Sequence, residues 1–199
     1  MLVVHKPSNM LSVPGKNPDD GLSLIDVLKP DYPDARIVHR LDMATSGVMV
    51  VANGTPSLRI LGKQFETRTP SKTYIARVWG RVQGHDGFID EPLICDYPNR
   101  PLQKICYIHG KPSQTHWRVL NRLHDSTILE LKPVTGRSHQ LRVHCQFMGH
   151  PIVGDNFYAA GDALAASDRL ELYAHQLTIN HPVTQERMTF TAPCPYVHT

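Results

Sequence analysis

The stretch Arg36–Ala52, RIVHRLDMATSGVMVVA, decides most of what can be predicted about this chain. Two apolar runs, Arg36–Val38 and Val48–Ala52, flank its polar centre. Runs rich in β-branched residues predict strands that are buried on both faces. Arg40 and Asp42 lie on the short connection between the two runs, and such a connection on a rigid sheet often carries catalytic groups. A surface turn is the more common alternative for this stretch alone, so the rest of the chain must decide.

Length and composition indicate an ordinary globular protein. The 199 residues fit one large domain or two small ones, with 41% hydrophobic and 20% charged residues. No apolar run approaches the ~18 residues of a membrane span, and the first residues lack the pattern of a signal peptide. The four cysteines are scattered without a CxxC pair. We therefore expect reduced thiols in a cytoplasmic protein that does not enter a membrane.

Positive charge is concentrated in the middle of the chain. The formal net charge is +3, but residues 59–142 hold 14 Lys and Arg against 7 Asp and Glu. A segment this basic suits a polyanionic partner such as RNA. A basic face that is simply solvated gives the same pattern, so charge alone does not identify the partner.

Periodicity and turn residues predict the secondary structure. Helical spacing predicts helices over residues 21–28, 55–65 and 137–148, with Thr55 as the cap of the second and Pro56 in its first turn. Further strands are expected over residues 72–79, 104–108, 114–123, 126–132, 170–180 and 187–192, and a loop over 155–168. This mixture predicts an α+β fold, with a mixed, mostly antiparallel central sheet and a few flanking helices, in one domain over residues 1–199.

Three polar sites stand where regular elements begin or end. They are Arg40 with Asp42, Lys72 with Tyr74, and the segment Gly136–Arg142. An arginine that faces an aspartate favours the ionised carboxylate, which a nucleophile or a base requires. A tyrosine offers a ring for stacking and a phenol for proton transfer. For a tyrosine on a strand, however, packing in the core is the more common role.

Four histidines raise the question of a metal site. They are His39, His139, His144 and His150. His139 and His144 are five residues apart, so they do not share a helix face as residues four apart would. Because no nearby acidic or cysteine residue completes a ligand set, we expect no metal. The sequence also has neither a glycine-rich phosphate loop nor a GxSxG turn, which argues against the usual nucleotide hydrolases and serine hydrolases.

Several motifs, in the right order, resemble those of the RluA-type pseudouridine synthases. Val38–Asp42 with Thr45–Gly47 resembles the aspartate motif, Lys72–Tyr74 the tyrosine motif, Gly136–His144 the third motif, Gly149–Asp155 the segment after it, and Val4–Gly15 the opening segment. The resemblance covers nearly the whole chain. Asn9 departs from the pattern, because the family usually has Gly there, and the sequence begins where the family's first strand should end.

The resemblance implies an RNA-modifying isomerase. Arg77–Gly80 and Cys95–Pro101 look closest to the dual-specificity members, which act on 23S rRNA and on the anticodon stem-loop of some tRNAs. We therefore expect a pseudouridine synthase that moves the C1′ glycosidic bond of a stem-loop uridine from N1 to C5. The family resemblance implies that RNA is the partner and that no cofactor is needed. The chain leaves no room for the separate S4-like RNA-binding domain that many relatives have. We expect a monomer.

By resemblance, three residues are catalytic. Asp42 is the carboxylate that either attacks C1′ or removes a proton from C2′, and the sequence does not choose between the two. Tyr74 stacks on the detached base and could take the C5 proton. Arg137 holds Asp42 ionised and oriented.

The predicted substrate-binding residues are Arg40, Leu141, Lys72 and His39. Arg40 is expected to fill the space of the flipped base, with a salt bridge that braces the loop as its alternative. Leu141 is expected to pack beside the uracil, and His39 to act as a scaffold for the motif. The main alternative function is a non-catalytic RNA-binding or RNA-folding protein on the same fold, and a metal-dependent nuclease is a distant third.

Overall fold

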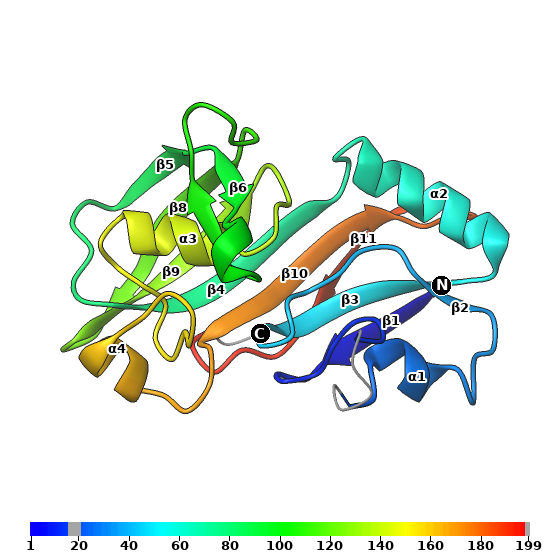
Figure 1. Cartoon of the computed structure of the whole chain (residues 1–199). Helices are drawn as coiled ribbons and strands as arrows, with labels where there is room; N and C mark the ends of the chain where they lie inside the picture. The colour runs from blue at the N-terminus through cyan, green and yellow to red at the C-terminus, as the bar shows by residue number, and fades with distance from the viewer. Residues whose placement is uncertain (16–20, 198–199) are drawn as a thin grey trace. The chain divides into compact units, whose positions relative to one another are not determined.

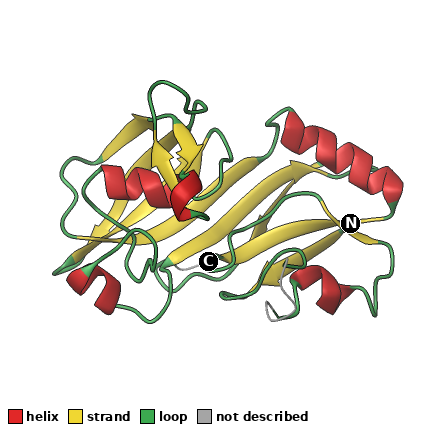
Figure 2. Cartoon of the chain, viewed as in Figure 1, coloured by secondary structure: helices red, strands yellow, loops and turns green. Residues whose placement is uncertain are grey.

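The computed structural model describes residues 1–15 and 21–197, which form two compact units. Unit 1 comprises Met1–Lys72 and Tyr173–Thr199, and unit 2 comprises Thr73–Leu172. Strands outnumber helices, which are few and short (Figure 2). The predicted α+β class with mostly antiparallel pairing is confirmed. The assignment of residues 1–199 to one catalytic domain stays a prediction. No helix in the described ranges is long and apolar enough to cross a membrane.

Strand β3 (Ser46–Asn53) is the centre of unit 1 (Figure 1). It pairs antiparallel with β1 (Leu2–Lys6) and with β2 (Ala35–Ile37). The beginning of β10 (Leu172–Asn180) runs parallel to it, and β11 (Arg187–Thr191) pairs antiparallel with β10. The mostly antiparallel pairing therefore includes one parallel pair, as a mixed sheet requires.

Helices cover both faces of β3. Val48 and Val50 pack with α2 (Thr55–Glu66) and with β10. Val51, on the opposite face, packs in a cluster with residues of α1 (Leu24–Leu28). Because residues 48–52 are at most 4% exposed, the predicted strand with both faces buried is confirmed.

Unit 2 contains a four-stranded antiparallel sheet and a separate hairpin. The sheet order is β4 (Ser71–Trp79), β9 (Ser126–Pro133), β8 (Gln114–Arg122) and β5 (Asp86–Asp90), where the first two residues of β4 belong to unit 1. The hairpin pairs β6 (Leu93–Cys95) with β7 (Gln103–Ile105) and includes the short 3-10 helix η2 (Tyr97–Asn99). Helix α3 (Gln140–Phe147) packs against this hairpin through Val143.

The predicted starts of two helices and the predicted cap of a third are wrong. Helix α1 begins at Leu24 instead of residue 21, after the N-cap Ser23. The cap of α2 is Gly54, at φ 86°, instead of Thr55. Helix α3 begins at Gln140 instead of residue 137, because His139 adopts a left-handed conformation at φ 54°. Left-handed residues interrupt a right-handed helix, and only glycine adopts them at no steric cost.

Segments between residues 86 and 168 also differ from the prediction. The strand expected over 104–108 ends at Ile105, because the Gly110 N–H donates to the Cys106 carbonyl at 2.8 Å and closes a turn. The sequence pattern does not predict strands β5 and β6 individually. The expected loop over 155–168 contains the helix α4 (Gly161–Ala165).

Candidate active site

Asp42 occupies a tight turn directly before strand β3. The Thr45 N–H donates to the Asp42 carbonyl at 3.0 Å, and the residue is half-buried. Gly47 follows at φ 128°, and a Cβ there would overlap the backbone of Ala174. The turn therefore leads into a strand that lies very close to its neighbour, and this fixes one end of the turn.

A buried lysine holds the other side of this turn. The Lys6 Nζ donates to the carbonyl oxygens of Pro7, Met10 and Met43 at 2.8, 2.7 and 3.0 Å. Its side chain is fully buried. Burial lowers the pKa of Lys6 to about 8, while the charge of Asp42 acts in the opposite direction. The lysine thus links the opening segment to the residue after Asp42 and places a positive charge near the carboxylate.

Two serines complete the attachment of the opening segment. The Ser12 hydroxyl donates to the Leu41 carbonyl at 3.0 Å and accepts from the Leu41 N–H at 3.2 Å. The Ser8 hydroxyl donates to the Ala44 carbonyl at 2.7 Å. Asn9 between them is left-handed, at φ 60°, a conformation that Asn tolerates better than most residues. This explains how Asn can stand where the family usually has Gly.

His39 is held inside the scaffold of unit 1. Its Nε2 accepts from the Val50 N–H at 3.1 Å, and its ring stacks on Phe65 with the centroids 4.4 Å apart. Burial, and then the charge of Lys72, lower the pKa of His39 to about 3. The imidazole is therefore neutral near pH 7. These contacts describe a supporting residue, and its assignment to substrate binding stays a prediction.

The two cations predicted to bind substrate differ in their surroundings. Arg40 is exposed and takes part in no ion pair within the described ranges 1–15 and 21–197. The base-flipping role of Arg40 and its alternative, a salt bridge that braces the loop, both stay predictions. Lys72 is half-buried, and burial, followed by the charge of Arg68, lowers its pKa.

Tyr74 lies near the beginning of β4 in unit 2. It stands opposite Leu131 in the antiparallel pairing with β9. Ala76 and Val78, two and four residues further on, are fully buried, whereas Tyr74 is only half-buried. The tyrosine thus lies at the accessible end of a face that otherwise packs in the core.

The Gln140 side chain fixes the backbone around Arg137. Its Oε1 accepts from the Thr135 hydroxyl at 2.7 Å and from the Arg137 N–H at 3.1 Å. Its Nε2 donates to the Gln114 carbonyl at 2.9 Å and to the Thr115 hydroxyl at 3.0 Å. The half-buried Arg137 directs its Nε to the Pro112 carbonyl at 3.5 Å. Helix α3 and β8 thus position the arginine turn together.

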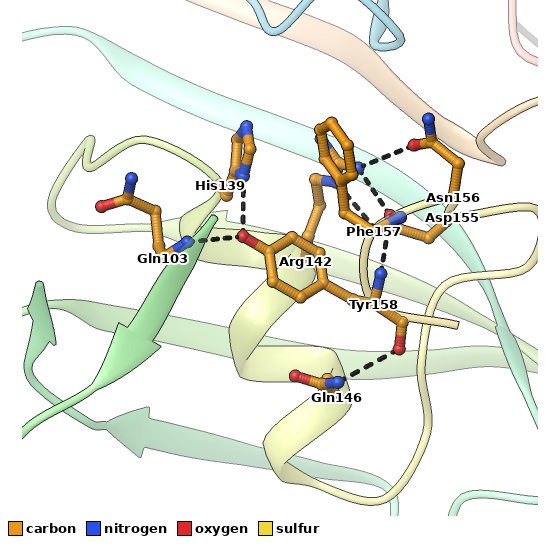
Figure 3. Close-up of polar contacts among 8 residues, drawn as sticks. All are labelled: Gln103, His139, Arg142, Gln146, Asp155, Asn156, Phe157 and Tyr158. Atoms are coloured by element: carbon orange, nitrogen blue, oxygen red, sulfur yellow. Dashed lines mark hydrogen bonds and ion pairs between the residues drawn. The ribbon is translucent and has the colours of Figure 1, made fainter. Parts of the chain in front are cut away.

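A buried ion pair joins α3 to the segment after it (Figure 3). The Arg142 Nε and Nη2 donate to the two Asp155 carboxylate oxygens at 2.8 and 2.5 Å, and the side chains are 2% and 0% exposed. The same carboxylate accepts from the N–H groups of Phe157 and Tyr158 at 2.9 and 3.2 Å. Such a bidentate pair gives both orientation and binding energy.

Tyr158 extends this network to the hairpin. Its hydroxyl accepts from the Gln103 N–H at 2.9 Å and lies 2.7 Å from the His139 Nδ1 (Figure 3). Leu141, the predicted wall of the uracil pocket, is 7% exposed on α3. The third motif is therefore held by contacts on several sides within unit 2.

The predicted site residues are divided between the two units. His39, Arg40, Asp42 and Lys72 belong to unit 1, and Tyr74, Arg137 and Leu141 to unit 2. The pairing of Asp42 with Arg137 and the individual roles stay predictions. The sequence pattern does not identify the supporting residues Lys6, Ser12, Gln140 and Asp155. Their position in segments that resemble the family's motifs is the one signal that points to them.

The histidines considered as metal ligands make hydrogen bonds inside the protein. His144 directs Nδ1 to the Thr115 hydroxyl at 2.9 Å and Nε2 to the Glu91 carbonyl at 3.1 Å. The His150 Nδ1 lies 2.8 Å from the Trp79 carbonyl. No group of three His, Cys, Asp or Glu side chains among residues 1–15 and 21–197 is arranged to hold a metal ion.

Comparison with known proteins gives consistent matches. Residues 1–147 match a family model described as RNA pseudouridylate synthase. The chain is 52% identical to "Dual-specificity RNA pseudouridine synthase RluA" of Escherichia coli K12, covering 98% of this chain and 90% of that protein. The protein of the same name from Yersinia pestis is 56% identical over 92% of this chain and 89% of its own length.

Solved structures agree in fold. The structure of human RNA Pseudouridylate Synthase Domain Containing 1 aligns with a TM-score of 0.82 and 30% identity, covering 98% of this chain and 80% of that one. Human RNA Pseudouridylate Synthase Domain Containing 4 aligns with a TM-score of 0.77 and 24% identity, covering 97% and 85%, which is a likeness of fold. The resemblance predicted from the motifs, including that to the dual-specificity members, is confirmed.

Proposed function

The chain belongs to the RNA pseudouridylate synthase family, and we propose that it converts a uridine in a stem-loop of 23S rRNA, of a tRNA anticodon arm, or of both, to pseudouridine. The observation that carries this proposal is the Asp42 turn, held by Lys6, Ser8 and Ser12, within a chain this similar to dual-specificity relatives. The RNA class follows the names of those relatives and the basic middle segment.

The proposed reaction rearranges one nucleotide without gain or loss of atoms. The N1–C1′ bond breaks, the uracil turns, and a C5–C1′ bond forms; C5 then loses its proton and N1 gains one. Asp42 either attacks C1′ or removes the C2′ proton, which is later returned. Either route needs an ionised carboxylate, and the buried Lys6, whose charge interacts with that of Asp42, holds the same turn. Because the reaction is an isomerisation, we propose that it uses no cofactor.

We assign the other site residues as follows. Tyr74 stacks on the detached uracil and takes the C5 proton, a role that suits its half-buried position. Arg137 orients the carboxylate of Asp42, Leu141 borders the base, and Lys72 binds the substrate. His39 supports the motif through the hydrogen bond from the Val50 N–H and the stacking of its ring on Phe65.

Arg40 is proposed to take the place of the target base. Removing a base from its stack costs a few kcal/mol, and less in a loop whose bases are already splayed. An exposed guanidinium with no ion pair in the described residues is available to fill the vacated space. The excess of cations in residues 59–142 would contact phosphates and make binding sensitive to salt.

We further propose that both units act as one catalytic domain in a monomer. We also propose that the protein acts in the cytoplasm, where thiols are kept reduced. The four cysteines are scattered along the chain, and none forms a disulfide in the described residues. The mass of the active species in solution tests the monomer directly.

Tritium release tests the activity against its main rival. The protein is incubated with stem-loop RNAs that carry tritium at uridine C5. A synthase releases tritium to water, because C5 exchanges its hydrogen for the glycosidic carbon. An RNA-binding protein without turnover binds the same RNAs and releases none. Release that persists in excess chelator also removes the metal-dependent nuclease.

A further inference from the structure

We infer that the segment Leu93–Lys111, here called the basic hairpin, is a binding surface for the unpaired nucleotides of the substrate RNA. This inference rests on the proposed function, since it names the part of unit 2 that receives the RNA. The basic hairpin comprises β6, η2, β7 and the turn that follows (Figure 1).

Large apolar side chains of the basic hairpin face solvent. Tyr97 is 65%, Tyr107 73% and Ile108 84% exposed. Their neighbours in the same hairpin, Leu93, Leu102 and Ile105, pack inward in a cluster with Val143 of α3, so the hairpin has its own packed side and does not need the exposed side chains for its core. Aromatic rings on a protein surface are stacking platforms for unpaired bases, and they tolerate any base because every base has a π-face.

Positive charge accompanies these rings. The basic hairpin contains Arg100, Lys104 and Lys111 against a single acidic residue, Asp96. Asp96 is paired with Lys104 at 2.9 Å, whereas Arg100 and Lys111 are exposed and are in no ion pair within residues 1–15 and 21–197. The Arg100 guanidinium lies 4.2 Å from the centre of the Tyr97 ring. A guanidinium over a tyrosine offers a base a second flat surface and a phosphate a positive charge.

The basic hairpin is also rigidly attached. Leu93 and Lys111 exchange backbone hydrogen bonds of 3.0 and 2.8 Å. A Cβ on Gly110 would overlap the Cys106 carbonyl and Pro92, so this turn closes only with glycine. Because the inner side packs against Val143 of α3 and against Tyr158, little conformational freedom remains to be lost when RNA binds.

The basic hairpin ends at the candidate active site of unit 2. Pro112, the residue after Lys111, offers its carbonyl to the Arg137 Nε at 3.5 Å. An RNA strand bound along the hairpin would therefore lead to the arginine that the family resemblance makes catalytic.

An exposed aromatic of unit 2 outside the basic hairpin lacks these properties and provides the control. Phe88 on β5 is 49% exposed and packs against His116 with the ring centroids 4.6 Å apart. Its strand begins with Asp86, ends with Asp90 and contains no Lys or Arg, so the strand itself carries negative charge. Truncating Phe88 removes an exposed ring of similar size at a position that the inference excludes from the RNA path.

The test measures RNA affinity and turnover separately, with a fluorescein-labelled synthetic tRNA anticodon stem-loop as the probe. Tyr97→Ala and Tyr107→Ala should each weaken binding about tenfold, the loss of roughly one stacked base. Arg100→Glu combined with Lys111→Glu should also lower the slope of log Kd against log salt by about 1 for each phosphate that is no longer neutralised. Phe88→Ala should bind as the wild type does. At saturating RNA, kcat should stay within about twofold of wild type, since these residues bind and do not react.

The outcomes separate the inference from the proposed function. All substituted side chains are exposed, so unchanged thermal unfolding checks the fold of each variant. Wild-type affinity in the two tyrosine variants and in the charge-reversal variant overturns the basic hairpin as an RNA surface, even if the enzyme is active. Equal weakening by Phe88→Ala overturns it as well. Failure of the wild type to release tritium overturns the proposed function, while the affinity ranking still tests the hairpin.

Discussion

Replacement of Asp155 by Asn should destabilise the protein strongly, because it leaves a buried cation without its counter-charge. The variant keeps the shape of the side chain and one oxygen that can accept from the Phe157 and Tyr158 N–H groups. It removes the charge that faces Arg142, whose side chain is 2% exposed. Breaking a buried ion pair in this way costs about 3–5 kcal/mol.

The loss is large enough to measure in two ways. For a chain of this length, each kcal/mol lowers Tm by about 2–4 °C, so Asp155→Asn should melt roughly 6–20 °C lower. Urea unfolding followed by circular dichroism gives the free energy of unfolding at constant pH. Both measurements should be made on Arg142→Met and on the double variant as well.

The difference in stability between the double variant and Asp155→Asn tests whether the unpaired buried cation causes the loss. Arg142→Met with Asp155→Asn removes the buried cation together with its partner, so it should be more stable than Asp155→Asn alone. A loss below about 1 kcal/mol for Asp155→Asn would show that the pair is hydrated, because only exposed pairs contribute so little. Additive losses in the double variant would show that the two side chains are not coupled.

Three further substitutions test the residues around Asp42 and Tyr74. His39 has a pKa of about 3 in the fold, so below pH 6.5 the unfolded chain binds more protons and stability falls, by up to about 1.4 kcal/mol per pH unit. His39→Gln, which keeps an acceptor for the Val50 N–H, should flatten this slope between pH 7 and 5 in urea titrations; an unchanged slope would mean that other groups produce it. Lys6→Met should lower kcat about 10- to 100-fold, because the Asp42 turn is displaced. Ser8→Ala loses one hydrogen bond in the same region and serves as the milder control. Wild-type kcat in Lys6→Met would contradict the positioning role. Tyr74→Phe should lower kcat about 10²- to 10⁴-fold if the phenol transfers a proton, and a normal rate leaves the ring only a stacking role.

Local patterns predict most of the strands. Residues 48–52 form a buried strand because every residue is apolar, and the two helices that cover it have their own periodic apolar positions. The hairpin of β8 and β9 likewise follows from two β-rich runs around a short polar turn. In these segments the preference of the residues and the surroundings in the fold agree.

Local patterns do not predict conformations and contacts that residue type leaves open. The start of α3 depends on a left-handed His139, and histidine is not the residue that usually signals such a conformation. The bond from Lys6 to Met43 joins residues 37 positions apart, beyond the reach of any local periodicity. Arg142 and Asp155 both lie in motifs that the resemblance identifies, yet spacing does not reveal that they pair. The residues proposed to react are thus found by motif, and those that hold them in place by structure.

The nucleoside composition of the product RNA tests the central claim most directly. A uridine-containing stem-loop is incubated with the wild type or with Asp42→Asn, digested, and separated by liquid chromatography. The wild type should yield one pseudouridine for each uridine lost, with no other product. Asp42→Asn should bind the RNA as tightly and form none. Pseudouridine at the wild-type rate from Asp42→Asn, or its absence from the wild-type reaction, would contradict the account.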